Sequence, residues 1–267
     1  MKGIILAGGK GTRLYPVTKA INKHLLPVYN KPMIFYPLAT LMLAGIRDFL
    51  IITNPEDIDG FKRLLGKGED LGIMISYAEQ YGANGIAEAI TIGEKFIGDD
   101  FFTLMLGDNI LYGSALGANI RKGIETTAPD TACVFAYPVA DPERYGIVEL
   151  DASGNPVSLE EKPERPKSNW AVPGLYIYGP KAIGLTKTLK PSKRGELEIT
   201  DLNQIYLKNE KLQVMALGRG YAWLDMGTVD SLLDTSEFVR TIEKRQGLPV
   251  CDPYEVAANH GWIKAAS

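Results

Sequence analysis

The residues best suited to phosphate chemistry form a glycine-rich run directly after the short apolar stretch Ile4–Ala7. The run reads Gly8-Gly9-Lys10-Gly11-Thr12-Arg13. Glycines that follow a strand allow backbone N–H groups to approach a phosphate without interference from a Cβ atom. Arg13 can offer a forked pair of donors to phosphate oxygens, and Lys23 can add a compact positive charge. The sequence therefore predicts a phosphate-binding loop.

Two common nucleotide-binding loops do not fit this run. The dinucleotide pattern G-x-G-x-x-G would need a glycine at Leu14, and the Walker pattern G-x-x-x-x-G-K-[ST] is absent. Neither NAD binding nor P-loop hydrolysis is therefore favoured. Taken alone, the run could also be a glycine-rich turn with surface cations, because short motifs match by chance.

Two aspartates are candidate metal ligands. Asp108 follows the apolar run 101–106, and Asp225 follows the largely apolar run 221–224. Ligands bind at the carboxyl ends of strands in α/β sheets, and Mg²⁺ takes one or two carboxylates together with phosphate oxygens. The alternative is ordinary turn chemistry, with Asp108 beside Asn109 and Asp225 shortly before a threonine. The spacing alone does not show that the two acids meet.

A second group of residues suits a sugar phosphate. Lys162 can neutralise a phosphate, Glu161 can accept hydrogen bonds from hydroxyl groups, and Gly146 allows close approach to the backbone. Arg194 is a further candidate for binding phosphate. The alternative is a Glu-Lys pair on a solvated strand end, which contributes little free energy.

The elements that must position these residues change in character along the chain. In the first half, strands are predicted at 4–7, 49–53, 73–77 and 101–106, with helices at 37–44 and about 86–96. Nearly unbroken apolar strands between helices predict a mainly parallel sheet covered on both faces. After about residue 130, strands are expected at 131–138, 147–150, 157–159, 175–178 and 212–217, with helices at about 197–208 and 229–245. The second and third of these strands predict a hairpin around 152–155.

We expect a single domain over residues 1–267. Its nucleotide-binding lobe would span about 1–130, its sugar-phosphate lobe about 131–228, and its C-terminal helical segment 229–267. The expected class is a three-layer α/β/α sandwich with a mixed, mainly parallel, Rossmann-like central sheet and a small β-rich sugar-binding lobe.

Several long motifs, in order along nearly the whole chain, resemble those of the sugar nucleotidyltransferases. The resemblance is strongest to glucose-1-phosphate thymidylyltransferases, whose fold is of the nucleotide-diphospho-sugar transferase type. The motifs are Gly8–Pro16, Lys23–Val28, Leu106–Asn109, Asp141–Gly146, Leu159–Pro163, Arg194–Asp201 and Gly220–Asp225.

The resemblance implies a reaction and a set of site residues. It implies transfer of a nucleotidyl group from dTTP to glucose 1-phosphate, giving dTDP-glucose and pyrophosphate by direct in-line displacement, with Mg²⁺ held by Asp108 and Asp225. Arg13, Lys23 and Lys162 would be catalytic. The implied nucleotide-binding residues are Gly8, Gly9, Gly11, Thr12, Arg13, Lys23, His24, Gln80, Gly85 and Asp108. The implied sugar-phosphate residues are Asn109, Gly146, Glu161, Lys162, Val172 and Arg194.

Three alternatives remain open beside this hypothesis. The same chemistry could use UTP or another sugar 1-phosphate, because residues 81–84 depart from the proline-rich stretch of close relatives. A metal-dependent glycosyltransferase can share this architecture. The loop with Arg13 and Lys23 argues against it, because a nucleoside triphosphate needs such cations more than the nucleotide sugar of a glycosyltransferase does. A catalytically inactive binding subunit could also keep the fold.

Composition restricts the partners and the location. The 267 residues carry a formal net charge of −3, which argues against a general nucleic-acid binder. The two cysteines, Cys133 and Cys251, form no paired motif, and the apolar stretch 33–46 is shorter than the roughly 20 residues that span a bilayer. We expect a cytoplasmic enzyme that binds no nucleic acid or membrane and forms a homo-oligomer, as the resemblance implies a homotetramer. The chain ends soon after Trp262, earlier than in many relatives, which leaves the family's C-terminal allosteric site an open question.

Overall fold

The computed structural model describes residues 1–264, which divide into two compact units that interleave along the chain. Unit 1 holds Met1, Asn84–Leu104 and Lys122–Tyr221, and unit 2 holds Lys2–Ala83, Met105–Arg121 and the chain from Ala222 onward. No helix in the described residues is both long enough and apolar enough to cross a membrane.

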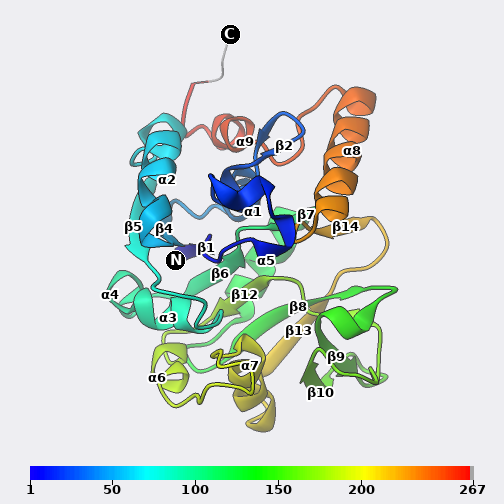
Figure 1. Ribbon diagram of the computed structural model, residues 1–267. Helices are drawn as coiled ribbons and strands as arrows, with labels where there is room; N and C mark the ends of the chain where they lie inside the picture. The colour runs from blue at the N-terminus through cyan, green and yellow to red at the C-terminus, as the bar shows by residue number, and fades with distance from the viewer. Residues whose placement is uncertain (265–267) are drawn as a thin grey trace. The chain divides into compact units, whose positions relative to one another are not determined.

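Unit 2 is built on a parallel sheet of three strands, β1 (Lys2–Leu6), β4 (Asp48–Thr53) and β5 (Met74–Glu79). All three lie close to the positions predicted from the apolar runs. Five of the six residues of β4 are buried, as expected for a central strand with both faces covered. Helix α2 (Ile58–Leu65) lies beside β5 (Figure 1). It buries Phe61 and Leu65.

Helix α1 (Phe35–Leu43) forms the buried centre of unit 2. Its residues from Phe35 to Met42 are all buried, which explains why this helix is apolar on every side. Helix α9 (Pro253–Asn259) packs against it, and the long helix α8 (Val229–Gln246) begins at a capping box made by Thr228 and Ser231. The other elements of unit 2 are the strands β2 (Pro27–Val28), β3 (Lys31–Pro32), β7 (Asn109–Gly113) and β14 (Tyr221–Asp225), the start of α5 (Leu116–Thr126), and 3₁₀ turns at Thr12–Leu14, Val17–Lys19, Lys23–Leu25, Pro55–Asp57 and Glu69–Leu71.

Unit 1 contains a mixed sheet with the strand order β10-β9-β11-β8-β12-β6. Strand β8 (Ala132–Pro138) is central, because it pairs in parallel with β13 (Leu212–Ala216) and in antiparallel fashion with β12 (Leu175–Tyr178). The predicted hairpin is present as β9 (Gly146–Leu150) and β10 (Pro156–Glu161). The remaining strands are β11 (Trp170–Ala171) and β6 (Phe102–Leu106).

The helices of unit 1 correct one prediction. The single helix expected over about 86–96 is two short helices, α3 (Glu88–Ile92) and α4 (Glu94–Ile97), which meet at Gly93. A glycine at this point weakens the helix because its backbone is less restricted than that of other residues. Helix α7 (Ile199–Lys208) lies where a helix was predicted, and α6 (Ala182–Thr186) was not predicted.

Candidate active site

The glycine-rich run forms an exposed loop in unit 2, between the end of β1 and the turn at Thr12–Leu14. Gly9 has φ 90° and Gly11 has φ 57°, a left-handed backbone that favours glycine at both positions. A Cβ atom on Gly11 would also lie only 2.9 Å from a side-chain carbon of Thr18. Leu14 is fully buried and anchors the turn, while the side chain of Arg13 is exposed to solvent. The local sequence therefore places an exposed cationic side chain in the turn that directly follows the glycines.

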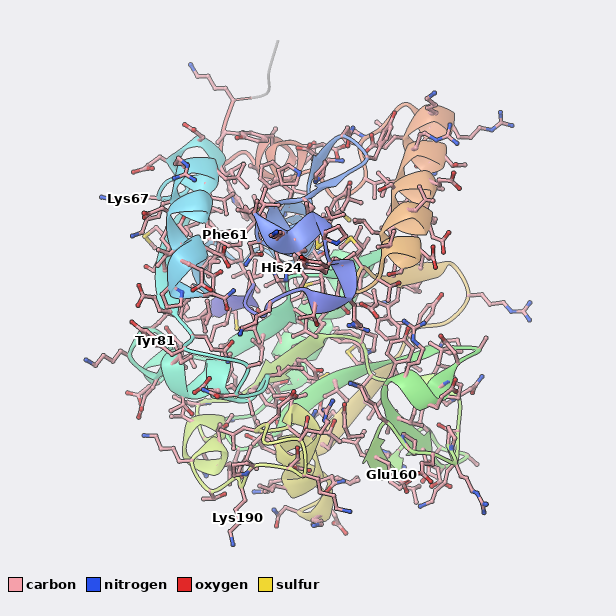
Figure 2. All side chains as sticks on the ribbon, in the orientation of Figure 1. His24, Phe61, Lys67, Tyr81, Glu160 and Lys190 are labelled. Carbon is pink, nitrogen blue, oxygen red and sulfur yellow. The ribbon has the colours of Figure 1, made fainter. Side chains whose placement is uncertain are left out.

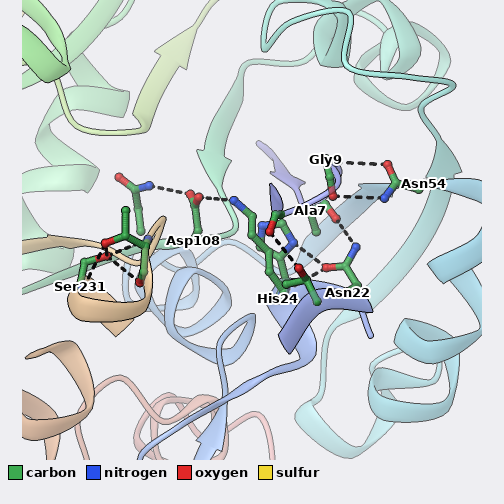
Figure 3. A network of polar contacts seen from close by, with 12 residues as sticks. Ala7, Gly9, Asn22, His24, Asn54, Asp108 and Ser231 are labelled. Atoms are coloured by element: carbon green, nitrogen blue, oxygen red, sulfur yellow. Dashed lines mark hydrogen bonds and ion pairs between the residues drawn. The ribbon is translucent and has the colours of Figure 1, made fainter. Parts of the chain in front are cut away.

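Lys23 and Asp108 form an ion pair in the same unit. The Lys23 ammonium lies 2.5 Å from Oδ2 of Asp108, and the Asn109 side chain donates to Oδ1 at 2.9 Å, as Figure 3 shows. Burial opposes ionisation of Asp108, but the charge of Lys23 and these hydrogen bonds hold its pKa well below the ordinary range. The carboxylate of Asp108 is therefore ionised at neutral pH.

The second acid, Asp225, lies next to the first along the paired backbones of β14 and β7. The backbone N–H of Met226 donates to the carbonyl oxygen of Asp108 at 2.9 Å. The indole N–H of Trp223 donates to the side chain of Asn109 at 2.7 Å. The structure thus brings together two acids that lie far apart in the sequence, as the metal hypothesis requires.

Arg13 lies beside Asp225. A Cβ atom built on Gly227 would be 2.6 Å from Nη2 of Arg13 and 2.9 Å from Oδ1 of Asp225. Gly227 is therefore needed for space, because any side chain here would displace the guanidinium or the carboxylate. The loop arginine and the second acid consequently share one small region of unit 2.

His24 and Gln80 are both buried in unit 2, with exposed fractions of 1% and 4%. In Figure 2, His24 lies among interior side chains while Lys67 points outward from the same unit. Burial, and next the charge of Lys23, lower the pKa of His24 to about 3, so its ring is neutral at physiological pH. A Cβ atom on Gly8 would lie 3.0 Å from the amide oxygen of Gln80, which places Gln80 next to the loop.

Three residues behind the loop did not emerge from the sequence. The side-chain amides of Asn22 and Asn54 both donate to Asp57. Asn54 also accepts from the N–H of Gly9, and Asn22 donates to the carbonyl of Ala7 (Figure 3). The sequence signal is an Asn-Pro-Glu-Asp run ahead of α2, which is typical of helix capping. Neither Asn54 nor Asp57 caps a helix through its side chain, however, so local pattern gave no indication of their contacts.

Unit 1 holds the residues suggested for a sugar phosphate except Asn109, which lies in unit 2 beside Asp108. The Thr200 hydroxyl donates to Oε2 of Glu161 at 2.6 Å, and Nη2 of Arg194 lies 3.6 Å from Oε1 of the same carboxylate. A Cβ atom on Gly146 would lie 3.2 Å from the Thr200 hydroxyl and 3.3 Å from Glu161. Arg194 is held mainly by Glu198, with Nη2 2.8 Å from its carboxylate. Gly146 on β9 therefore leaves open space next to the carboxylate of Glu161, which lies on β10.

Lys162 adopts an unusual backbone conformation beside this carboxylate. Its φ of 44° lies in the left-handed region, which costs a non-glycine residue on the order of 1 kcal/mol. The Lys162 N–H donates to the carbonyl of Tyr145 at 2.9 Å, and the N–H of Val172 donates to the carbonyl of Gly146 at 2.8 Å. Such strain concentrates at functional positions, and here it directs Lys162 away from the regular path of β10.

Gly85 has a packing role in unit 1. It has φ 104°, and a Cβ atom there would lie 2.3 Å from the backbone oxygen of Leu197. The Leu197 N–H also donates to the carbonyl of Asn84 at 2.7 Å, and the Ala87 N–H donates to that of Leu197 at 3.2 Å. Two chain segments therefore approach so closely that only glycine fits.

Within residues 1–264, no three side chains of His, Cys, Asp or Glu are grouped so that they could hold a metal ion. Asp108 and Asp225 lie on neighbouring backbone segments joined by a hydrogen bond. Two carboxylates suit a hard divalent cation that takes its other ligands from substrate phosphate and water.

Comparisons with known proteins agree with one another. A model of the nucleotidyl transferase family matches residues 2–242. The chain is 56% identical to a glucose-1-phosphate thymidylyltransferase of Neisseria meningitidis, over 98% of this chain and 91% of the relative. It is 57% identical to the enzyme of that name from Mycobacterium tuberculosis, over 98% and 90%.

Solved structures support the same fold. A Bacillus anthracis structure described as a glucose-1-phosphate thymidylyltransferase in complex with sucrose matches with a TM-score of 0.82 and 41% identity, over 90% of this chain and 95% of that one. A UDP-glucose pyrophosphorylase complexed with UDP-glucose matches with a TM-score of 0.78 and 26% identity, over 90% and 98%. These matches confirm the predicted α/β class with a mixed, mostly parallel sheet.

Proposed function

We propose that this chain, which belongs to the nucleotidyl transferase family, transfers the nucleotidyl group of dTTP to glucose 1-phosphate. The products would be dTDP-glucose and pyrophosphate. The observation that carries the proposal is the arrangement in unit 2, where Asp108 and Asp225 lie on hydrogen-bonded backbone segments with Lys23 on one acid and Arg13 beside the other. The names of the relatives at 56% and 57% identity supply the two substrates.

In unit 2, two cations are available to the triphosphate. The exposed Arg13, in the turn after the glycines, would hold the phosphates that leave as pyrophosphate, because a guanidinium forms bidentate contacts with phosphate oxygens. Lys23, already paired with Asp108, would contact the remaining phosphates as a compact charge. The N–H groups of the glycine-rich run other than that of Gly9, which donates to Asn54, would complete the cradle.

The acid pair fits a magnesium ion by the chemistry of its donors. Asp108 is held as a carboxylate, and Asp225 lies on the adjoining backbone segment. We propose that Asp108 and Asp225 hold the ion. When bound, Mg²⁺ would supply positive charge that stabilises the phosphate oxygens during displacement.

In unit 1, we propose that Lys162 and Arg194 bind the phosphate of glucose 1-phosphate. Glu161 would accept hydrogen bonds from sugar hydroxyls, since its two oxygens are acceptors oriented by Thr200 and Arg194. The backbone at Gly146 and the side chain of Val172 would border the sugar.

The reaction needs no strong general base. An oxygen of the sugar phosphate is already anionic, and it forms a bond to the α-phosphorus of dTTP. The bond from that phosphorus to the bridging oxygen of the β-phosphate breaks, and pyrophosphate leaves with the electron pair. The residues named above contribute by positioning two anions and offsetting their repulsion.

Pyrophosphate release tests the proposal. The wild-type protein should release pyrophosphate only when dTTP, glucose 1-phosphate and Mg²⁺ are all present, with UTP and other sugar 1-phosphates compared in parallel. Asp108→Asn, Asp225→Asn and Lys162→Met should each lower turnover on the order of 10²–10³-fold, the effect of removing one preorganised charge contact. Turnover close to that of the wild type in all three variants would exclude these roles.

Assembly into a homotetramer and a cytoplasmic location stay predictions from the sequence. Analytical ultracentrifugation of the purified protein would test the first, and cell fractionation would test the second.

A further inference from the structure

Asp57 occupies an unusual place behind the phosphate loop. One of its oxygens, Oδ2, accepts two hydrogen bonds, from the side-chain amide of Asn54 at 2.8 Å and from that of Asn22 at 2.7 Å. Oδ1 of Asn54 accepts from the backbone N–H of Gly9 at 3.2 Å, and the Asn22 amide also donates to the carbonyl of Ala7 at 3.2 Å. Figure 3 shows the contacts of Asn54 with Gly9 and of Asn22 with Ala7. Asp57 connects these two asparagines.

The chemistry of the partners fixes the direction of both amides. An ionised carboxylate only accepts hydrogen bonds, so Asn54 and Asn22 must each turn their NH₂ group toward Asp57. A backbone N–H only donates, and the amide oxygens accordingly face the N–H of Gly9 and, at 2.9 Å, the N–H of His24. Each asparagine therefore joins Asp57 to a backbone donor of the candidate nucleotide site.

This network links two segments that carry the proposed triphosphate contacts. Asn54 reaches the glycine-rich loop at Gly9, and Asn22 reaches the turn that carries Lys23. Asn22 is 6% exposed, so its amide depends on protein partners more than on water. Asp57 is also the residue before α2, but its side chain makes no capping hydrogen bond there.

We propose that Asp57 is a positioning residue for nucleotide binding. By fixing the amides of Asn54 and Asn22, it orders the loop backbone at Gly9 and the backbone that carries Lys23 before the triphosphate arrives. The inference rests on the proposed function, because dTTP is the ligand that the ordered loop would receive. Without Asp57, the loop would become ordered only when the nucleotide binds. The free energy needed for this ordering would weaken the binding of dTTP.

Three variants separate this role from a general effect on stability. Asp57→Ala removes the shared acceptor. Asp57→Asn keeps one oxygen that can accept from both asparagines, and it is the conservative rescue. Glu56→Ala is the matched control, because it removes an exposed carboxylate next in sequence and in the same 3₁₀ turn ahead of α2. Each variant is assayed for the KM of dTTP, the KM of glucose 1-phosphate, and hydrogen exchange of the amides of residues 8–13.

The expected result is selective. Asp57→Ala should raise the KM for dTTP about tenfold, equivalent to about 1.4 kcal/mol, and leave the KM for glucose 1-phosphate within about twofold. Exchange at Gly9 should become at least about tenfold faster, and both effects should largely disappear in Asp57→Asn and be absent in Glu56→Ala. If Asp57→Ala does not fold, Asn54→Ala must show the faster exchange at Gly9.

Three results would overturn the inference. One is unchanged exchange at Gly9 in the variant that lacks Asp57 or Asn54. The others are an equal rise in both KM values and a failure of Asp57→Asn to rescue, since either would indicate a general structural role. A wild-type protein that turns over no dTTP would refute the proposed function instead, while hydrogen exchange would still test the network.

Discussion

The neutral buried state of His24 makes a quantitative prediction about stability and pH. The ring is 1% exposed, and its Nδ1 lies 2.8 Å from Oδ1 of Asn22. The Asn22 amide NH₂ is already directed to Ala7 and Asp57, so its oxygen accepts and Nδ1 of the ring is the protonated nitrogen. A second proton would have to enter a buried ring beside the Lys23 ammonium, which is why the pKa falls to about 3.

The sign of the effect follows from proton binding. In the unfolded chain His24 has its ordinary pKa of 6.5, and in the folded chain its pKa is about 3. The unfolded state therefore binds the proton first, and the free energy of unfolding falls as pH drops below 6.5, continuing to about 3. Between about pH 7.5 and about pH 5.5, this one group should lower the stability by about 1.4 kcal/mol.

Urea unfolding of the wild type and of His24→Gln measures this contribution. Glutamine can still donate an N–H toward Asn22 but does not titrate. Subtracting the two pH profiles cancels the titration of other groups to first order. The wild type should lose about 1.4 kcal/mol more than the variant over this range. Equal losses in the two proteins would refute the account of a neutral His24 inside unit 2.

Two glycines give predictions of opposite kind. Gly227→Ala should leave thermal stability nearly unchanged but lower kcat/KM for dTTP by up to about 100-fold. The reason is that its Cβ would displace the flexible end of Arg13 or the carboxylate of Asp225. Normal kinetics would contradict the placement of these two groups. Gly85→Ala should lower the free energy of unfolding by roughly 1–3 kcal/mol, because its Cβ would lie 2.3 Å from the rigid backbone of Leu197. Urea unfolding measures this loss, and a stability equal to that of the wild type would contradict the packing role of Gly85.

The strands were predictable because their signal is local. The apolar runs ahead of Gly8 and Asp108 gave β1 and β6 within one or two residues of the observed bounds. Strand β7 was missed, since its sequence Asn-Ile-Leu-Tyr-Gly is short and begins with a residue uncommon in strands. Helix α5 was missed as well, because its sequence is interrupted by two glycines.

The candidate site was predictable as a set of residues but not as an arrangement. Motif resemblance named Asp108 and Asp225, yet only the folded backbone shows Met226 bonded to the carbonyl of Asp108. The network around Asp57 could not be predicted at all. Asparagine and aspartate near a helix start read as capping residues, and their contacts with distant loops are set by tertiary structure.

The most direct test of the proposed chemistry follows the oxygen atoms of the sugar phosphate. Glucose 1-phosphate labelled with ¹⁸O throughout its phosphate is incubated with dTTP, Mg²⁺ and the protein, and the products are identified by ³¹P NMR and mass spectrometry. Direct displacement at the α-phosphorus predicts that all the label appears in dTDP-glucose, including the oxygen that bridges its two phosphorus atoms, and that pyrophosphate carries none. Label in pyrophosphate, or consumption of dTTP without formation of a nucleotide sugar, would contradict the account.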